Sequence, residues 1–187
     1  MTDTLHFFID RTATPLGELM VVADAEDRLR MLDWTEHEDR ALRLLRQQYR
    51  GAAVALEQRR NPGGLTAAMR AYFAGELAAI DDLPVETGGT AFQRSVWAAL
   101  RGIPCGHAIS YAELARRIGR PTAVRAVGHA NGSNPISIVV PCHRVIGADG
   151  TLTGYGGGLP RKRWLLAHEG CEAVVSQPLL AAARRAA

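Results

Sequence analysis

The chain contains 187 residues, of which 47% are hydrophobic and 22% are charged, and its formal net charge is +3. It is long enough for one good core or two small ones, and its composition is that of an ordinary globular protein. The N-terminus has no secretory signal and no apolar run approaches a membrane span, so we expect a cytoplasmic protein without a membrane partner. The three cysteines, Cys105, Cys142 and Cys171, form no CxxC pair, which argues against a disulfide framework or a zinc knuckle.

Charge is distributed unevenly along the chain. Residues 1–84 carry 10 arginines and 14 acidic residues, a net charge of −4, whereas residues 85–187 carry 12 basic and 5 acidic residues, a net charge of +7. A basic half suggests a polyanionic partner. An arginine-rich composition without such a ligand explains the charge equally well, so charge alone does not decide between the two.

The first part of the chain predicts a small antiparallel sheet with helices. Its β-compatible runs are LHFFID, ELMVVAD and LRMLDW, separated by turn-forming residues. Thr35 followed by Glu38 is typical of a capping box and predicts a helix that ends near Gly51. A second helix should follow, with one apolar face made of Leu65, Met69, Tyr72 and Phe73. The turn-rich stretch DDLPVETGG then marks the end of an N-terminal domain, which we place at residues 1–84.

The second part of the chain, residues 85–170, reads as helices joined by tight connections. The segments TAFQ and SYAE, which start at Thr90 and Ser110, predict two more capping boxes, and the second one opens a short helix that stops at Gly119. Thr122 is then expected to cap a helix running through AVRAVGHAN. Two short helices joined by a glycine-containing turn are the helix-turn-helix pattern, although such a pair also occurs as a corner within a helical core.

The second helix of this pair has an unusual composition for a buried element. Arg125 projects near its start and His129 lies one turn further on, while the other positions are small: Ala123, Ala126, Gly128 and Ala130. Small residues permit close approach to another surface, and the amides at a helix N-terminus favour phosphate. Plain helix–helix packing also uses small residues, and Arg125 favours the phosphate-binding interpretation only modestly.

Cys142 stands where a buried segment stops, in the sequence VVPCHRV behind the apolar run 136–140. A thiolate is strongly nucleophilic, and a nearby proton acceptor such as His143 increases its population. Neighbouring side chains in an extended segment point to opposite faces, so contact between these two residues requires a turn or a bridging water. A cysteine after an apolar strand is also often just a small buried hydrophobic residue.

Two features downstream of Cys142 bear on whether it is a nucleophile or only a buried hydrophobic residue. The segment PRKRWLLAHEG predicts a helix with Pro160 in its first turn and Gly170 just past its end. Glu169 therefore faces the negative end of a helix dipole, where it is either merely solvated or used to orient an imidazole. The loop TGYGGG lacks the Gly-Lys-Ser/Thr of a nucleotide P-loop, and it is either a plain loop or a pocket wall that holds Tyr155.

Taken together, these segments resemble the O6-alkylguanine-DNA alkyltransferases, in particular the bacterial constitutive methylated-DNA–protein-cysteine methyltransferases. The resemblance covers roughly residues 5–170, and it is strongest in NGSNPISIVVPCHRVIG, TLTGYGGGLPRKRWLLAHEG, TAFQRSVWAALRGIPCG and ISYAELARRIG. It implies a ribonuclease H-like domain at residues 1–84 and a mainly helical, winged-helix-like domain with the helix-turn-helix at residues 85–170. Only the tail, residues 171–187, falls outside.

The resemblance also implies a function and catalytic roles. The protein would flip O6-alkylguanine out of duplex DNA and transfer the alkyl group irreversibly to Cys142, in a single-turnover suicide reaction. His143 would act as the base through a water molecule, with Glu169 orienting it. Asn134 would brace the site, and Tyr111 would donate a proton or a hydrogen bond to the departing guanine.

The remaining implied residues would bind the base and the DNA. The base pocket would be lined by Val145, Tyr155, Gly156 and Gly157. Arg125 would fill the gap left in the duplex, and its helix would contact DNA through Thr122, Ala123, Ala126 and His129. His129 stands where we expect a small residue, and we predict that it touches the DNA backbone.

Neither a cofactor nor a metal is expected. Some relatives hold a structural zinc with N-terminal cysteine and histidine, and here no cysteine precedes Cys105. The expected partner is double-stranded DNA containing O6-alkylguanine, without an obligatory protein partner. Activity on O4-alkylthymine and cooperative self-association on DNA stay open.

Three other functions compete with this interpretation. An alkyltransferase-like lesion binder would keep the pocket but lack the cysteine, so Cys142 argues against it. A thiol hydrolase using Cys142 and His143 would turn over repeatedly and would need an oxyanion site, which the sequence does not show. A transcription factor built on the helix-turn-helix would leave PCHRV unexplained.

Overall fold

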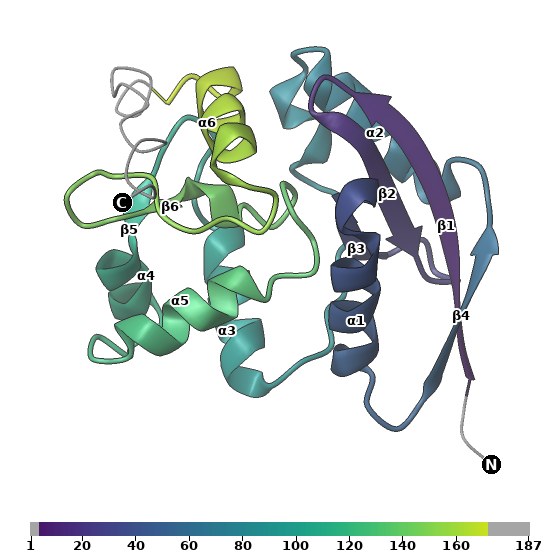
Figure 1. The fold of residues 1–187 in the computed structure, drawn as a ribbon, viewed down its shortest axis with the longest axis horizontal. Coiled ribbons are helices and arrows are strands. Elements are labelled where there is room, and N and C mark those ends of the chain that lie inside the picture. The colour runs from purple at the N-terminus through teal and green to yellow at the C-terminus, as the bar shows by residue number, and fades with distance from the viewer. Residues whose placement is uncertain (1–3, 172–187) are drawn as a thin grey trace, which may run out of the picture.

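A four-stranded mixed sheet builds the N-terminal half of the computed structural model, which describes residues 4–171 (Figure 1). Strands β1 (Thr4–Thr14), β2 (Gly17–Ala23) and β3 (Leu29–Trp34) form an antiparallel meander. The fourth strand, β4 (Ala53–Gln58), pairs with β1 in parallel, which gives the order β3-β2-β1-β4.

The predicted small antiparallel sheet is confirmed for β1, β2 and β3, but the prediction missed β4, which makes the sheet mixed. The chain leaves β3, passes through the 3-10 helix η1 (Thr35–His37) and helix α1 (Glu38–Gln48), and returns on the far side of β1. Such a crossover brings the next strand back in parallel. The predicted capping box at Thr35 is also wrong. Helix α1 starts after His37, whose side chain does not cap it, and the Thr35 hydroxyl donates instead to the carbonyl of Glu18.

Alternating side chains along β2 divide the core between the two faces of the sheet. Met20 and Val22 pack under α1 against Ala41 and Leu45. On the opposite face the sheet packs on α2 (Leu65–Phe73) and on the C-terminal domain, through side chains that include Leu19, Val21, Leu65 and Met69. The 3-10 helices η2 (Pro62–Gly64) and η3 (Leu77–Ile80) flank α2.

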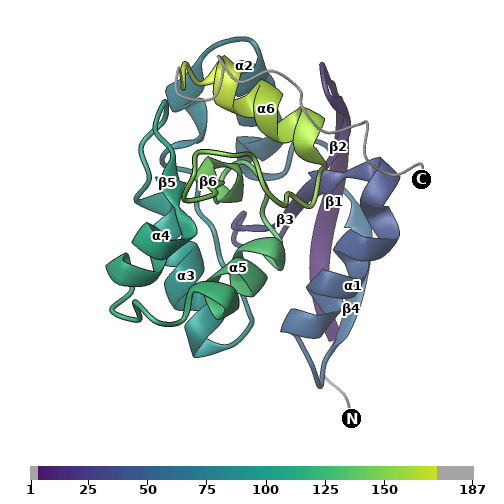
Figure 2. The same ribbon diagram turned by 60° about the vertical axis from the view of Figure 1, so that its left-hand side comes forward.

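The C-terminal half is mainly helical, as expected, and lies beside the sheet (Figures 1 and 2). Its helices are α3 (Ala91–Arg101), α4 (Tyr111–Arg117), α5 (Val124–Gly132) and α6 (Leu159–His168). A 3-10 turn, η4 (Cys142–Arg144), and a parallel pair of two-residue strands, β5 (Ile109–Ser110) and β6 (Val145–Ile146), complete it. Within residues 4–171 no helix is long and apolar enough to cross a bilayer.

The outer edge of β3 is covered by the segment at the domain boundary and by the C-terminal half. The amide of Leu29 donates to the carbonyl of Pro84 over 2.8 Å, and the amide of Leu32 donates to the carbonyl of Pro135 over 2.9 Å. The amide of Ser137 donates back to Leu32 over 2.9 Å. Pairing of this kind removes the free edge of the sheet and fixes the segment before Cys142 against the N-terminal domain.

The predicted helix starts in this half are mostly confirmed. Thr90 forms a full capping box with Gln93, and the Ser110 side chain accepts from the amide of Glu113. The Glu113 carboxylate, however, accepts from Arg116 and Arg117 of the same helix. The Thr122 cap is wrong, because α5 begins one residue later, after Ala123, without a side-chain cap.

Candidate active site

A sharp turn, rather than a strand, delivers Cys142 to the centre of the C-terminal half. The apolar run 136–140 makes a single bridge, Ile136 to Leu32, and then turns through Ile138, whose φ is +71°. A positive φ is strained for a β-branched residue, and packing on every side holds Ile138 there with no exposed surface. Cys142 follows at the start of η4 with 5% of its surface exposed.

Asn134 holds this turn together. Its side-chain oxygen accepts from the amide of Ile136 over 3.0 Å, and its amide group donates to the carbonyl of Val140 over 2.8 Å. Both backbone groups lie in the run that leads to Cys142, so Asn134 fixes the path of the chain into the site. The resemblance implied that Asn134 braces the site, and these two hydrogen bonds are compatible with that role.

His143 and Glu169 meet in the interior. The Nε2 atom of His143 lies 2.9 Å from a carboxylate oxygen of Glu169, and both side chains are fully buried. A carboxylate only accepts hydrogen bonds, so Nε2 carries the proton and Nδ1 keeps its lone pair. Nδ1 is also buried and has no hydrogen-bond partner within residues 4–171. The imidazole is therefore set up to accept a proton at Nδ1.

Two further side chains, which sequence reasoning missed, converge on Glu169. Arg144 donates from Nε over 2.7 Å and from a terminal nitrogen over 2.9 Å to the two carboxylate oxygens, and the Tyr72 hydroxyl donates over 2.8 Å. Arg144 was visible within the PCHR motif, but nothing local linked it to a residue 25 positions away. Tyr72 reaches the site because α2 of the N-terminal domain packs beside the end of α6.

This network determines the charges of the pair. Burial by itself raises the pKa of Glu169, but the hydrogen bonds and charges of His143 and Arg144 hold it well below its usual range. Burial lowers the pKa of His143, and the nearby carboxylate offsets this only in part. At neutral pH the site therefore holds an ionised Glu169 and a neutral His143, the form of histidine that can accept a proton.

The thiol of Cys142 is protonated in the resting site. Burial raises its pKa, while a hydrogen bond with Asn134 and the charge on Lys162 act in the opposite direction. Lys162, also missed from the sequence, is fully buried, and its Nζ donates over 2.6 Å to the carbonyls of Val145 and Thr153. Burial lowers the pKa of this amine to about 8. Formation of a thiolate therefore requires a base.

The loop 151–158 forms a wall beside these residues. The ring of Tyr155 meets those of Trp34 and His143 edge-on, with centroids 6.1 Å and 6.4 Å apart. Gly157 packs so tightly that a Cβ there would lie 2.7 Å from the Trp34 ring, and a Cβ at Gly156 would meet the guanidinium of Arg40. The two glycines thus let the loop close onto the N-terminal domain, a contact that the sequence did not predict.

Val145 and Tyr111 complete the surroundings of Cys142. Val145 is fully buried in β6. Tyr111 is the first residue of α4, and its ring would lie 3.8 Å from a Cβ on Gly128, so the small residue in α5 makes room for it. Burial raises the pKa of Tyr111, and the nearby Cys142 adds to the effect, which keeps its hydroxyl protonated as a hydrogen-bond donor.

Helix α5 presents one open face to solvent. Thr122, Arg125, Ala126 and His129 are exposed and Ala123 is half-buried, whereas Val127 and Ala130 are buried against α3 and α4. The predicted DNA-contacting residues therefore all reach the surface on the turn before α5 and on α5 itself. The arginine on this face, Arg125, makes no ion pair with the part of the chain that the structure describes.

The fold and the site define a two-domain protein with a buried cysteine beside an imidazole–carboxylate pair and an open helix of small residues. Two family models match the chain. Residues 10–87 match the ribonuclease-like domain of 6-O-methylguanine DNA methyltransferase, and residues 91–171 match its DNA-binding domain. The chain belongs to the O6-methylguanine DNA methyltransferase family, which confirms the resemblance seen in the sequence.

Individual relatives agree with this assignment. A methylated-DNA–protein-cysteine methyltransferase of Shigella flexneri is 56% identical over 166 residues, covering 89% of this chain and 97% of that protein. The protein of the same name from Salmonella typhimurium is 57% identical over the same shares. Among solved structures, the Mycobacterium tuberculosis OGT in complex with DNA is 42% identical, covers 89% of this chain and 93% of that chain, and gives a TM-score of 0.68.

Proposed function

We propose that this chain repairs alkylated DNA by moving the alkyl group from O6 of guanine to the sulfur of its own Cys142. The single observation that carries the proposal is a buried thiol beside a neutral histidine whose Nδ1 is free to take a proton. Relatives that are 56–57% identical over most of the chain bear the name methylated-DNA–protein-cysteine methyltransferase.

The reaction begins with removal of the thiol proton. That proton passes through a water molecule to Nδ1 of His143, and the resulting imidazolium is stabilised by the Glu169 carboxylate, 2.9 Å from Nε2. The thiolate then attacks the alkyl carbon, forming an S–C bond while the C–O6 bond breaks. The electron pair of the broken bond remains on guanine, and Tyr111 donates a proton or hydrogen bond to the departing base.

The product explains why the protein acts once. A thioether has no carbonyl carbon for water to attack, unlike a thioester, so water cannot release the alkyl group from Cys142. One protein molecule is therefore consumed for each lesion repaired.

Access of the buried Cys142 thiol to O6 requires the base to leave the duplex, because O6 lies on the major-groove edge of the base pair and an enclosed sulfur cannot reach it there. The exposed face of α5 fits the minor groove, where small residues allow close approach and Arg125 fills the gap left by the base. The extruded base enters beside Val145, Tyr155, Gly156 and Gly157. His129, on the same face, contacts the DNA backbone. His129→Ala should weaken binding and its salt dependence, and unchanged values for both would refute this contact.

Finer features of the fold belong with this proposal. The sheet with α1 and α2 corresponds to a ribonuclease H-like domain over residues 1–84, and α3–α6 with the β5–β6 pair to a winged-helix-like domain over residues 85–170. Of the predicted tail, residues 171–187, all but Cys171 lies outside the described residues. O4-alkylthymine as a second substrate and self-association on DNA stay predictions.

The competing functions predict different products. A thiol hydrolase would turn over repeatedly and release its acyl group, and a lesion binder or a transcription factor would leave Cys142 unmodified. The test is to mix the protein with a duplex containing one O6-methylguanine and to weigh the peptide that carries Cys142. We expect a gain of one methyl group in the wild type and in Cys105→Ala, and none in Cys142→Ala. A methyl group on another residue would overturn the proposal.

A further inference from the structure

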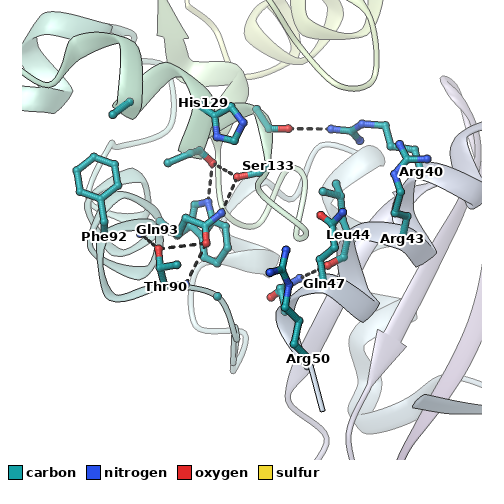
Figure 3. A pocket seen from close by; sticks show the side chains of 16 residues that line it. Arg40, Arg43, Leu44, Gln47, Arg50, Thr90, Phe92, Gln93, His129 and Ser133 are labelled. Atoms are coloured by element: carbon teal, nitrogen blue, oxygen red, sulfur yellow. Dashed lines mark hydrogen bonds between the residues drawn. The ribbon is translucent and has the colours of Figure 1, made fainter. Parts of the chain in front are cut away.

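A cationic groove runs between the N-terminal domain and the helix that we place on DNA. One wall is α1 and the turn after it, with Arg40, Arg43, Gln47 and Arg50, and the other is formed by the start of α3 and by α5 (Figure 3). It encloses about 990 Å³. The wall on α5 includes Ala126 and His129, two of the exposed residues of the proposed DNA face, so the groove opens directly onto that face.

The arginines of this groove differ in what they do for the fold. Arg40 is used structurally, since it pairs with Asp33 over 3.0 Å. It also donates to the carbonyl of Gly132 at the end of α5 over 2.9 Å (Figure 3). Arg43 and Arg50 are exposed, and neither makes an ion pair or a side-chain hydrogen bond within residues 4–171. Nothing in the described fold requires these two guanidinium groups.

The lining selects for an anion. Three arginines and a histidine contribute to it, and none of its sixteen residues is acidic. This is notable because the surrounding domain, residues 1–84, is acidic overall. Glutamine, threonine and serine supply uncharged donors between the arginines, among them Gln47, Thr90 and Ser133. Separated cations joined by neutral donors suit a chain of spaced charges better than one compact anion.

We infer that this groove, through Arg43 and Arg50, binds the sugar-phosphate backbone of the DNA beside the lesion, which extends the DNA contact from α5 onto the N-terminal domain. The inference rests on the proposed function, because it takes α5 to be the helix that lies on DNA. Phosphate contacts position a protein without reading sequence, so both arginines should add affinity equally on damaged and undamaged duplex.

The test measures DNA affinity as a function of salt for Arg43→Gln, Arg50→Gln and the double variant. Arg46→Gln is the matched control, because Arg46 is equally exposed on α1 but does not line the groove. Fluorescence anisotropy with an inactive Cys142→Ala background reports binding to a duplex with one O6-methylguanine and to the unmodified duplex. Transfer from the free base O6-methylguanine, without DNA, is measured in the same variants with Cys142 intact and reports whether each keeps an intact site.

The double variant should bind both duplexes about tenfold more weakly at low salt, and the slope of log K against log salt should fall by about two. Arg46→Gln should match the parent protein, and free-base transfer should be unchanged in all variants. Equal affinity and slope in the double variant and the control would overturn the inference. So would a loss that appears only when several protein molecules bind one duplex, because the groove would then hold a second copy. Failure of the parent protein to bind or react would instead refute the proposed function.

Discussion

Replacing Glu169 by glutamine tests the buried network at the site most directly. The substitution keeps the shape of the side chain but removes the charge that His143 and Arg144 share. Arg144 is 7% exposed and would keep its hydrogen bond to the carbonyl of Ile103 and the amide oxygen of the glutamine, but no negative partner. Removing one partner of a buried ion pair costs about 3–5 kcal/mol, because the other charge stays buried. We therefore expect the free energy of unfolding to fall by about that amount, measured by urea titration.

The same substitution should also slow alkyl transfer. The amide of glutamine can donate to Nε2 of His143, which moves the imidazole proton to Nδ1 and blocks proton acceptance there. General base catalysis contributes about 10²–10⁴-fold, so single-turnover transfer should slow by at least about 100-fold. Tyr72→Phe is the control, since it removes one hydrogen bond to Glu169 and leaves the other partners, costing about 1.5 kcal/mol in stability with little change in rate.

The pH dependence provides an independent check. The pKa of Glu169 is held below its usual range, so its contribution to stability is fully present above the ordinary glutamate pKa of about 4.3 and is lost as the pH falls through the folded value. The difference in unfolding free energy between wild type and Glu169→Gln should be constant near neutral pH and shrink in acid. If Glu169→Gln had the same unfolding free energy and the same transfer rate as the wild type, this account of the network would be refuted.

Three further outcomes follow from other contacts. The pKa of Lys162 is lowered to about 8, so between about pH 8 and 10.4 its amine is protonated in the unfolded chain and neutral in the folded one. The unfolding free energy of the wild type, measured by urea titration, should therefore rise across that window relative to Lys162→Met. A difference between the two proteins that does not change with pH would contradict the lowered pKa. Gly157→Ala should push the loop off the rigid Trp34 ring and slow transfer strongly, whereas Gly156→Ala meets the end of the Arg40 side chain, which can shift at the cost of its contacts to Asp33 and Gly132, and should slow transfer less; equal rates for the two would contradict the packing argument. Tyr111→Phe should slow transfer by about 10²-fold in rapid-quench assays without lowering DNA affinity, and an unchanged rate would remove Tyr111 from the reaction.

Local signals in the sequence predicted the elements that carry the site. The caps at Thr90 and Ser110 depend on residues three positions apart, and the start and end of α6 are marked by Pro160 and Gly170, so each can be read from a short window. The position of Glu169 against the helix dipole was the one local hint that this carboxylate has a specific partner.

Contacts between distant segments were not predictable in the same way. Tyr72 is 97 positions from Glu169, and only the packing of the two halves brings them together. The parallel pairing of β4 likewise depends on how the chain crosses after α1. The turn before Cys142 was misread because an apolar run of five residues fits a strand, while hydrogen bonds from Asn134 and the edge of β3 bend it in the folded chain.

The most direct test is a count of guanines restored per protein molecule when the methylated duplex is in large excess. The sulfur of Cys142 forms a bond that water does not break, so the count should rise to one and stop, and Cys142→Ser should remain near zero. A count that climbs past one with time, or repair that survives loss of this sulfur, would contradict the claim that the protein consumes itself.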